Sequence, residues 1–292
     1  MRVVVTGSEG QLARSLAEKA QGWPAVELVT LGRPGLDLEA QGSAFEAIVS
    51  AAPDVVINTA AYTAVDQAEE EPERAFRINA DGAGEVAAAA ARVGASIIQI
   101  STDYVFDGRQ ALPYDEMAKV GPIGVYGRSK LAGEMQVGES NPRHAIVRTA
   151  WVYSPFGRNF VKSIMAAGAI RAKLTVVDDQ RGSPTSALDL AEGLLTMIDK
   201  GFPPGEIYHL GGSGQATWCD FAREIMDQCA DLGLPHAAVE SISTDEWPTK
   251  AVRPHNSVLD SGKFQRDFAF SMPDWRESVR RVIERLASSP TT

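Results

Sequence analysis

The stretch RVVVTGSEGQLA at residues 2–13 joins an apolar, β-branched run to a segment of helical composition through a glycine-rich turn. Gly7 permits a tight turn, and Gly10 lets the backbone approach a bound pyrophosphate. Ala13 is small enough for the following helix to pack against the sheet. The first N–H groups of that helix are left to bind phosphate. The stretch therefore predicts a dinucleotide-binding strand–turn–helix unit.

Strand-like and helix-like segments alternate through the first half of the chain, which favours a parallel sheet covered on both faces. The expected strands are 2–6, 26–31, 54–59, 95–100 and 145–148, and the expected helices are 11–20, 43–51, one starting at Pro72, 81–93 and 125–137. Later helices are expected at 160–169, 187–198, 218–232 and 274–287, and strands at 174–177 and 207–210. We therefore expect an α/β protein with a Rossmann-type doubly wound parallel sheet over residues 1–155. Residues 156–292 should form mainly a smaller α/β substrate-binding domain, from which some segments return to the main sheet.

The composition narrows the class of protein. The 292 residues carry 28 Lys and Arg against 38 Asp and Glu, a net charge of −10, so no nucleic-acid partner is expected. The sequence has only two cysteines, Cys219 and Cys229, which argues against a disulfide framework or zinc cluster. The four histidines are scattered, so no metal ligands are predicted. No apolar run is long enough for a membrane span and no signal peptide is seen, so a cytoplasmic enzyme without a membrane partner is expected.

Tyr126 and Lys130 form a Tyr-x-x-x-Lys pair in a segment expected to be helical, so both project from one helix face. An ammonium beside a phenol favours the phenolate, and we therefore expect Lys130 to lower the Tyr126 pKa from about 10 toward neutral pH. Such a tyrosine is a good general acid for a carbonyl that is being reduced. Thr102 closes the fourth expected strand upstream. Together they predict a hydride-transfer site with its own proton donor.

The end of the second strand bears on the choice of cofactor. It reads Leu31-Gly32-Arg33, without the acid that would bind the adenosine ribose 2′-OH of NAD. Arg33 could contact a 2′-phosphate, which favours NADPH and leaves NADH possible. The alternative, that Arg33 is an ordinary surface arginine, stays open. Asp37 is better placed beside the adenine than at the ribose.

Further motifs resemble those of the extended short-chain dehydrogenase/reductases, and within them the dTDP-4-dehydrorhamnose reductase family. The motifs are GSEGQLA (7–13), NTAAYTAVDQAE (58–69), INA (78–80), STDYVFDG (101–108), VYGRSKLAGE (125–134), RTAWVYSPFGRNFV (148–161), VVDDQRGSPTS (176–186), YHLGG (208–212) and RPHNSVLD (253–260). GQL, AAYTAVDQAE, TAWVY and DQRGSPTS in this order are the most specific, and the resemblance covers nearly the whole length.

The resemblance implies reduction of the 4-keto group of dTDP-4-dehydro-L-rhamnose to dTDP-L-rhamnose with NAD(P)H. Under it, Tyr126 donates the proton, Lys130 holds the nicotinamide ribose and tunes Tyr126, and Thr102 hydrogen-bonds the substrate oxygen. Trp151 would pack on the sugar. The implied cofactor residues are Gly10, Gln11 and Leu12 at the pyrophosphate, Asp37 and Leu38 near the adenine, and Ala61, Tyr62 and Thr63 after the third strand.

Other side chains are candidates for the substrate site. Asp103 is adjacent to Thr102, and Asn159 could either contact the diphosphate or cap the helix that begins at Phe160. Arg253 with Asn256 could hold the diphosphate, because a guanidinium fork suits phosphate oxygens. The rival role for Arg253 is a surface ion pair. A loosely held Mg²⁺ ion and a homodimer are possible.

Two other kinds of function stay open. A nucleotide-sugar 4-epimerase or 4,6-dehydratase would share the fold, although the dehydratase pattern has a Glu where Tyr104 follows Thr102-Asp103. The fold is also reused in a non-catalytic regulatory subunit of methionine adenosyltransferase. The presence of Thr102, Tyr126 and Lys130 argues against such a loss of catalysis.

Overall fold

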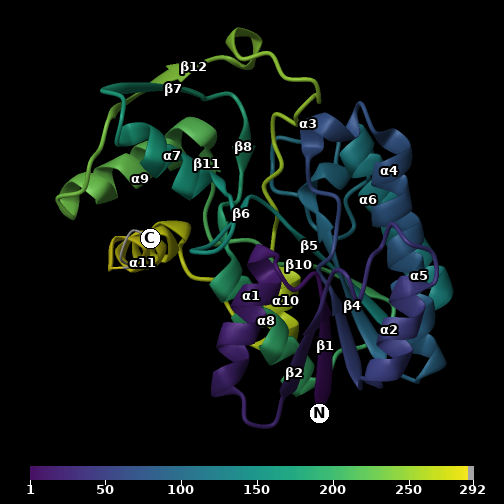
Figure 1. Cartoon of the computed structure of the whole chain (residues 1–292). Coiled ribbons are helices and arrows are strands. Elements are labelled where there is room, and N and C mark those ends of the chain that lie inside the picture. The colour runs from purple at the N-terminus through teal and green to yellow at the C-terminus, as the bar shows by residue number, and fades with distance from the viewer. Residues whose placement is uncertain (289–292) are drawn as a thin grey trace.

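A computed structural model gives the structure of residues 1–288, which is built around a six-stranded parallel sheet (Figure 1). The strand order is β10-β5-β4-β3-β1-β2, and every neighbouring pair is parallel. The strands are β1 (Arg2–Thr6), β2 (Glu27–Leu31), β3 (Val55–Asn58), β4 (Ser96–Thr102), β5 (His144–Thr149) and β10 (Glu206–His209). This arrangement confirms the expected Rossmann-type fold.

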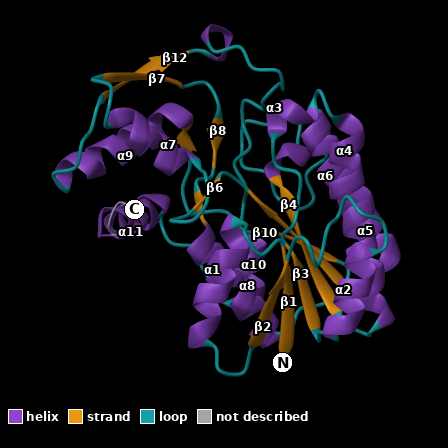
Figure 2. Cartoon of the chain, in the orientation of Figure 1, coloured by secondary structure: helices purple, strands orange, loops and turns teal. Residues whose placement is uncertain are grey.

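Helices cover both faces of the sheet (Figure 2). Successive side chains of a strand point to opposite faces, so Val3 and Val5 enter one hydrophobic core and Val4 enters the other. The helices on the first face are α1 (Gln11–Lys19), α8 (Ala187–Lys200) and α10 (Gly262–Phe268). Those on the second face are α2 (Ser43–Ala51), α5 (Gly82–Arg92) and α6 (Val125–Ser140).

The sheet is completed by a strand from the second half of the chain. Residues of β10 pair in parallel with β5, so that Ile207 lies opposite Ile146. α8, which precedes β10 in sequence, packs against α1. The chain beyond residue 155 therefore supplies both an edge strand and a covering helix of the main sheet.

A second lobe lies beyond the carboxyl ends of the sheet strands (Figure 1). Its core gathers apolar side chains such as Phe221 and Trp275, each no more than 1% exposed. Its helices are α7 (Phe160–Gly168), α9 (Trp218–Asp231) and α11 (Trp275–Ser288). Three short strand pairs frame it, namely β7 (Lys173–Val177) with β12 (Ala238–Ile242), β8 (Arg181–Gly182) with β11 (Ala216–Thr217), and β6 (Val152–Tyr153) with β9 (Thr185–Ser186).

Sequence analysis does not predict several elements, most of which are too short to carry a periodic pattern. They include the two-residue strands, and also β12 and α10. The others are α3 (Val65–Ala68), the 3₁₀ turns Ala20–Gly22, Asp103–Val105 and Thr244–Glu246, and the π-helical turn Arg77–Asp81. The helix expected to start at Pro72 is α4 (Pro72–Phe76). No helix within residues 1–288 has the length and apolar character needed to cross a membrane.

Candidate active site

A cleft of about 890 Å³ opens where the strands of the main sheet end at their carboxyl sides. In open α/β sheets this edge is where ligands bind, because the loops that follow the strands converge there. The predicted site residues that line the cleft are Gly7, Gly10, Gln11, Leu12, Arg33, Asp37, Leu38, Ala61, Tyr62, Thr63, Thr102, Asp103, Tyr126, Lys130 and Trp151. The sequence motifs are thus brought together in one place.

The glycine-rich turn after β1 forms a cradle at one side of the cleft. Gly7 has a φ of +81°, a left-handed conformation that favours glycine, and a Cβ there would lie 3.1 Å from Cα of Ala60. Gly10 precedes α1 and has no side chain to cap it, so the first N–H groups of α1 are left for a ligand. The first turn of α1 contains no acidic residue. The turn therefore fits a pyrophosphate.

The end of β2 lies beside this cradle, and it carries Arg33, a cation without a partner in the described chain. A Cβ on Gly32 would lie 2.3 Å from Oγ and 3.1 Å from the backbone N of Ser8, so glycine avoids a shift of the turn. Arg33 is exposed and makes no hydrogen bond or ion pair with another residue of the described chain. Its guanidinium is therefore available to a ligand phosphate.

Tyr126 lies in the first turn of α6 and is partly buried at the other end of the cleft. Its ring packs edge-to-face on Tyr104, with centroids 5.6 Å apart. Burial raises the pKa of Tyr126 to about 12, against the lowering effect of a hydrogen bond with Thr102, while the carboxylate of Asp103 adds to the rise. The predicted fall in this pKa is therefore wrong, because burial outweighs any stabilisation of the phenolate. At neutral pH the phenol therefore keeps its proton.

Lys130 is only 4% exposed, and its Nζ donates to the carbonyl oxygen of Ile100 at 2.7 Å. Burial lowers the pKa of Lys130 to about 8, and the carboxylate of Glu134 opposes this by raising it. The ammonium is thus directed to the end of β4 rather than to the phenol. This contact explains why Lys130 does not depress the Tyr126 pKa as predicted.

A buried ion pair lies behind Lys130. Arg148 of β5 donates from Nε and Nη2 to the two carboxylate oxygens of Glu134, at 2.9 and 2.7 Å, and both side chains are at most 6% exposed. Ser101 donates to the same carboxylate. A bidentate pair with an added hydrogen bond fixes the Glu134 side chain one turn after Lys130 on α6. Sequence analysis did not single out either partner.

Asp103 is 2% exposed and follows Thr102 at the end of β4. The Thr102 hydroxyl donates to Oδ1 of Asp103 at 3.0 Å. Burial raises the pKa of Asp103 to about 6, although its hydrogen bonds lower it in part. Because Thr102 also shares a hydrogen bond with Tyr126, the three side chains form one polar chain at the cleft.

Trp151 stands in the cleft wall in a strained conformation. Its φ is +45°, which bulky residues rarely adopt. Its indole stacks on Trp218 of α9 with centroids 3.5 Å apart and planes 6° apart. A Cβ on Gly182 would lie 2.3 Å from the same indole. Trp151 is therefore held in one orientation, and Trp218, which sequence analysis missed, also lines the cleft.

The other three candidate substrate residues do not line the cleft. Asn159 caps α7 by accepting from Lys162 N at 3.2 Å, and it donates to Gln11 Oε1 at 3.0 Å. Arg253 forms an ion pair with Asp66 at 2.7 Å, the rival role considered from sequence. Asn256 donates to the Gln110 carbonyl at 2.7 Å. In this structure each of these side chains holds neighbouring chain segments together.

The N-terminus of α6, the helix that carries Tyr126, is capped by a residue that lies far away in the sequence. Gly124 precedes α6 and has no capping side chain, and Glu69 instead accepts from Val125 N at 2.7 Å. A Cβ on Gly124 would lie 2.9 Å from that carboxylate oxygen. A carboxylate at the N-terminus of a helix satisfies a free N–H and favours the helix dipole. Glu69 thus fixes the turn from which Tyr126 projects.

Side chains that could bind a metal ion do not cluster in the described part of the chain. Within residues 1–288, no group of three or more His, Cys, Asp or Glu side chains is arranged to hold a metal ion.

The sequence is similar to a known family along its length. Residues 1–288 match the family model described as the RmlD substrate binding domain. A dTDP-4-dehydrorhamnose reductase of Sinorhizobium fredii is 46% identical over 291 residues, which cover 98% of each protein. The spore coat polysaccharide biosynthesis protein SpsK of Bacillus subtilis is 36% identical, with 99% of each covered.

Solved structures are similar over almost the same length. The structure of a dTDP-4-dehydrorhamnose reductase from Clostridium acetobutylicum has a TM-score of 0.91 and 39% identity, covering 98% of this chain and 100% of that one. The Bacillus anthracis dTDP-4-dehydrorhamnose reductase in complex with NADP has a TM-score of 0.91 and 36% identity, covering 97% and 99%. With the cleft and its Tyr126, Lys130 and Thr102 side chains in the places just described, the chain belongs to the dTDP-4-dehydrorhamnose reductase family.

Proposed function

We propose that this protein reduces the 4-keto group of dTDP-4-dehydro-L-rhamnose to give dTDP-L-rhamnose, with NADPH as cofactor and Tyr126 as proton donor. The observation that carries the proposal is that Tyr126, Thr102 and Lys130 meet in the same cleft as the Gly7–Gly10 cradle. Relatives of matching length bear the name of this activity, and one of them is a complex with NADP.

The cofactor, when bound, supplies the hydride that forms the new C–H bond at C4. Tyr126 gives its hydroxyl proton to the carbonyl oxygen, so that the C=O bond becomes C–OH and the phenol becomes phenolate. Thr102 shares a hydrogen bond with Tyr126, and its hydroxyl would turn from Asp103 to stabilise that phenolate and to contact the same substrate oxygen. Lys130 holds a positive charge behind the site.

The other residues of the cleft would bind and orient the cofactor and the sugar. The turn after β1 and the N-terminus of α1 would hold the pyrophosphate, and Asp37 with Leu38 would lie at the adenine. Trp151, fixed by its stack on Trp218, would place a flat apolar surface beside the sugar. We keep Asp103 in the substrate site because its buried carboxyl is bonded to Thr102.

The test is a rate measurement with purified protein, dTDP-4-dehydro-L-rhamnose and NADPH. We expect oxidation of the nicotinamide with stoichiometric dTDP-L-rhamnose. Cofactor binding without turnover would favour the regulatory alternative, and conversion of the sugar without net oxidation would favour an epimerase.

Arg33 makes a prediction about cofactor choice. Because its guanidinium has no other partner in the described chain, it should contact the 2′-phosphate that distinguishes NADPH from NADH. Arg33→Ala should raise KM for NADPH by about tenfold, as loss of an exposed charge-assisted hydrogen bond would, and leave KM for NADH nearly unchanged. Initial rates with the two cofactors measure this, and equal effects on both would remove Arg33 from the role.

The lowered pKa of Lys130 leads to a prediction about the pH dependence of kcat/KM. Its ammonium is present below about pH 8 and is lost above it, whereas Tyr126, with a pKa of about 12, stays protonated throughout. The value of kcat/KM, which reports the free enzyme, should therefore fall as the pH rises through about 8. Lys130→Arg, whose guanidinium stays charged, should remove this fall from the activity that remains. A wild-type profile that is flat to pH 10 would contradict the prediction.

A further inference from the structure

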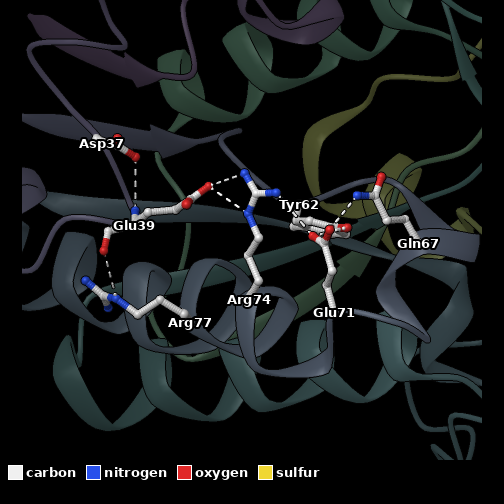
Figure 3. Close-up of polar contacts among 7 residues, drawn as sticks. All are labelled: Asp37, Glu39, Tyr62, Gln67, Glu71, Arg74 and Arg77. Carbon is white, nitrogen blue, oxygen red and sulfur yellow. Dashed lines mark hydrogen bonds and ion pairs between the residues drawn. The ribbon is translucent and has the colours of Figure 1, made fainter.

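The turn after β2 forms one wall of the cleft at the end expected to hold adenosine. Asp37, Leu38 and Glu39 line the cleft there, and Arg74 of α4 lines it too. Figure 3 shows Arg74 between Glu39 on one side and Glu71 with Tyr62 on the other. The Arg74 side chain therefore connects α4 to two loops of the cleft.

Three N–H groups of Arg74 donate to these neighbours. Its Nε and Nη2 donate to Oε1 of Glu39 at 3.0 and 2.7 Å, and its Nη1 donates to Oε2 of Glu71 at 3.1 Å. Its guanidinium lies over the ring of Tyr62, 5.7 Å from the centroid. Glu71 is held in turn by the hydroxyl of Tyr62 at 3.0 Å and by Gln67 at 2.6 Å. The hydrogen bond to Glu39 is the main reason why the pKa of Arg74 lies above its usual range.

Glu39 is held at three points (Figure 3). Its carboxylate accepts from Arg74, its carbonyl accepts from Nε of Arg77 at 3.4 Å, and its N–H donates to Oδ1 of Asp37 at 3.0 Å. Arg74 and Arg77 are three residues apart and lie on one helical face. A single exposed ion pair would contribute little, but these contacts together fix both the backbone of Glu39 and the Asp37 carboxylate.

We propose that Arg74 is a positioning residue for the adenosine half of the cofactor, and that it acts by holding Glu39 and thereby the turn Asp37–Glu39 in its binding conformation. This inference rests on the proposed function, since it needs a dinucleotide in the cleft. We do not assign Arg74 as the phosphate ligand, because three of its five N–H groups already donate to two carboxylates. That role stays with Arg33, whose guanidinium is free within the described chain.

The test is binding of NADPH and of ADP by calorimetry to the wild type and to Arg74→Ala. ADP carries the adenosine half without the nicotinamide. We expect both dissociation constants to rise by about tenfold, because the variant must order the Asp37–Glu39 turn on binding. At saturating NADPH, kcat and KM for the keto sugar should match the wild type, because Tyr126 and Thr102 are untouched.

Three further variants separate positioning from a general structural role. Arg74→Lys keeps a cation for Glu39 and should recover most of the affinity, and Glu39→Ala should weaken binding as Arg74→Ala does. The double variant should be no weaker than either single variant, since both remove one interaction. Arg280→Ala, which removes a half-buried arginine of α11 paired with Glu284 and Asp231, is the matched control and should bind like wild type.

The outcomes are distinct. Unchanged affinity of Arg74→Ala for ADP and NADPH would overturn the inference and leave the proposed function standing. A lowered kcat together with a lower melting temperature would also overturn it, because that is the result of general destabilisation. If the wild-type protein binds neither ADP nor NADPH, the proposed function itself fails.

Discussion

Replacing Tyr126 with phenylalanine should lower kcat by about 10²–10⁴-fold, the usual contribution of a positioned proton donor. The change removes the hydroxyl of this side chain and leaves the ring against Tyr104 in place. The dissociation constant for NADPH should stay within about twofold of wild type, because the glycine cradle after β1 is untouched. Steady-state rates at saturating substrate and cofactor titrations give the two quantities.

Tyr208→Phe is the control for this experiment. Tyr208 is buried in β10, outside the cleft lining, and its hydroxyl contacts Asp267 at 3.1 Å. This variant loses a phenol without altering the cleft, so its kcat should be close to wild type. A Tyr126→Phe protein that turned over like the control would show that another group donates the proton.

Replacing Arg148 with methionine should lower the free energy of unfolding by about 3–5 kcal/mol. The substitution removes the bidentate partner of the buried Glu134 carboxylate and leaves it only the longer-range charge of Lys130. Chemical denaturation should show an earlier midpoint in the single variant. Removing one partner of a buried pair is more harmful than removing both, because the remaining charge keeps its full desolvation cost.

The double variant Arg148→Met, Glu134→Leu provides the matched control. It removes both charges and should recover most of the lost stability. It also removes the carboxylate that raises the pKa of Lys130, so the alkaline fall in kcat/KM should move below pH 8. A single variant as stable as wild type, or a double variant with an unmoved pH profile, would contradict this account of the pair.

The features that sequence predicts well are local ones. The turn Gly7–Gly10 lies within a single strand–helix junction, so its residue types alone define its geometry. Tyr126 and Lys130 share a helix face because they are four residues apart on α6. The parallel sheet follows from the alternation of apolar strands and helices along the chain.

The features that sequence could not predict depend on partners far along the chain. Arg253 pairs with Asp66, which is 187 residues away, and Glu69 caps α6 across 56 residues. The Tyr126 pKa was predicted in the wrong direction for a related reason. Its value is set by burial, which is a property of the assembled cleft and is not encoded in the Tyr-x-x-x-Lys spacing.

The position of β10 has a consequence for how the chain folds during synthesis. When a ribosome has released residues through β5, the sheet has five of its six strands, and the outer edge of β5 is unpaired. That edge can recruit another chain until residues 206–209 emerge and dock. α8, which packs against α1, also lies in the part of the chain made after β5. A nascent chain stalled after β5 and before β10 should therefore be the aggregation-prone species of this protein. Chaperones would bind this species.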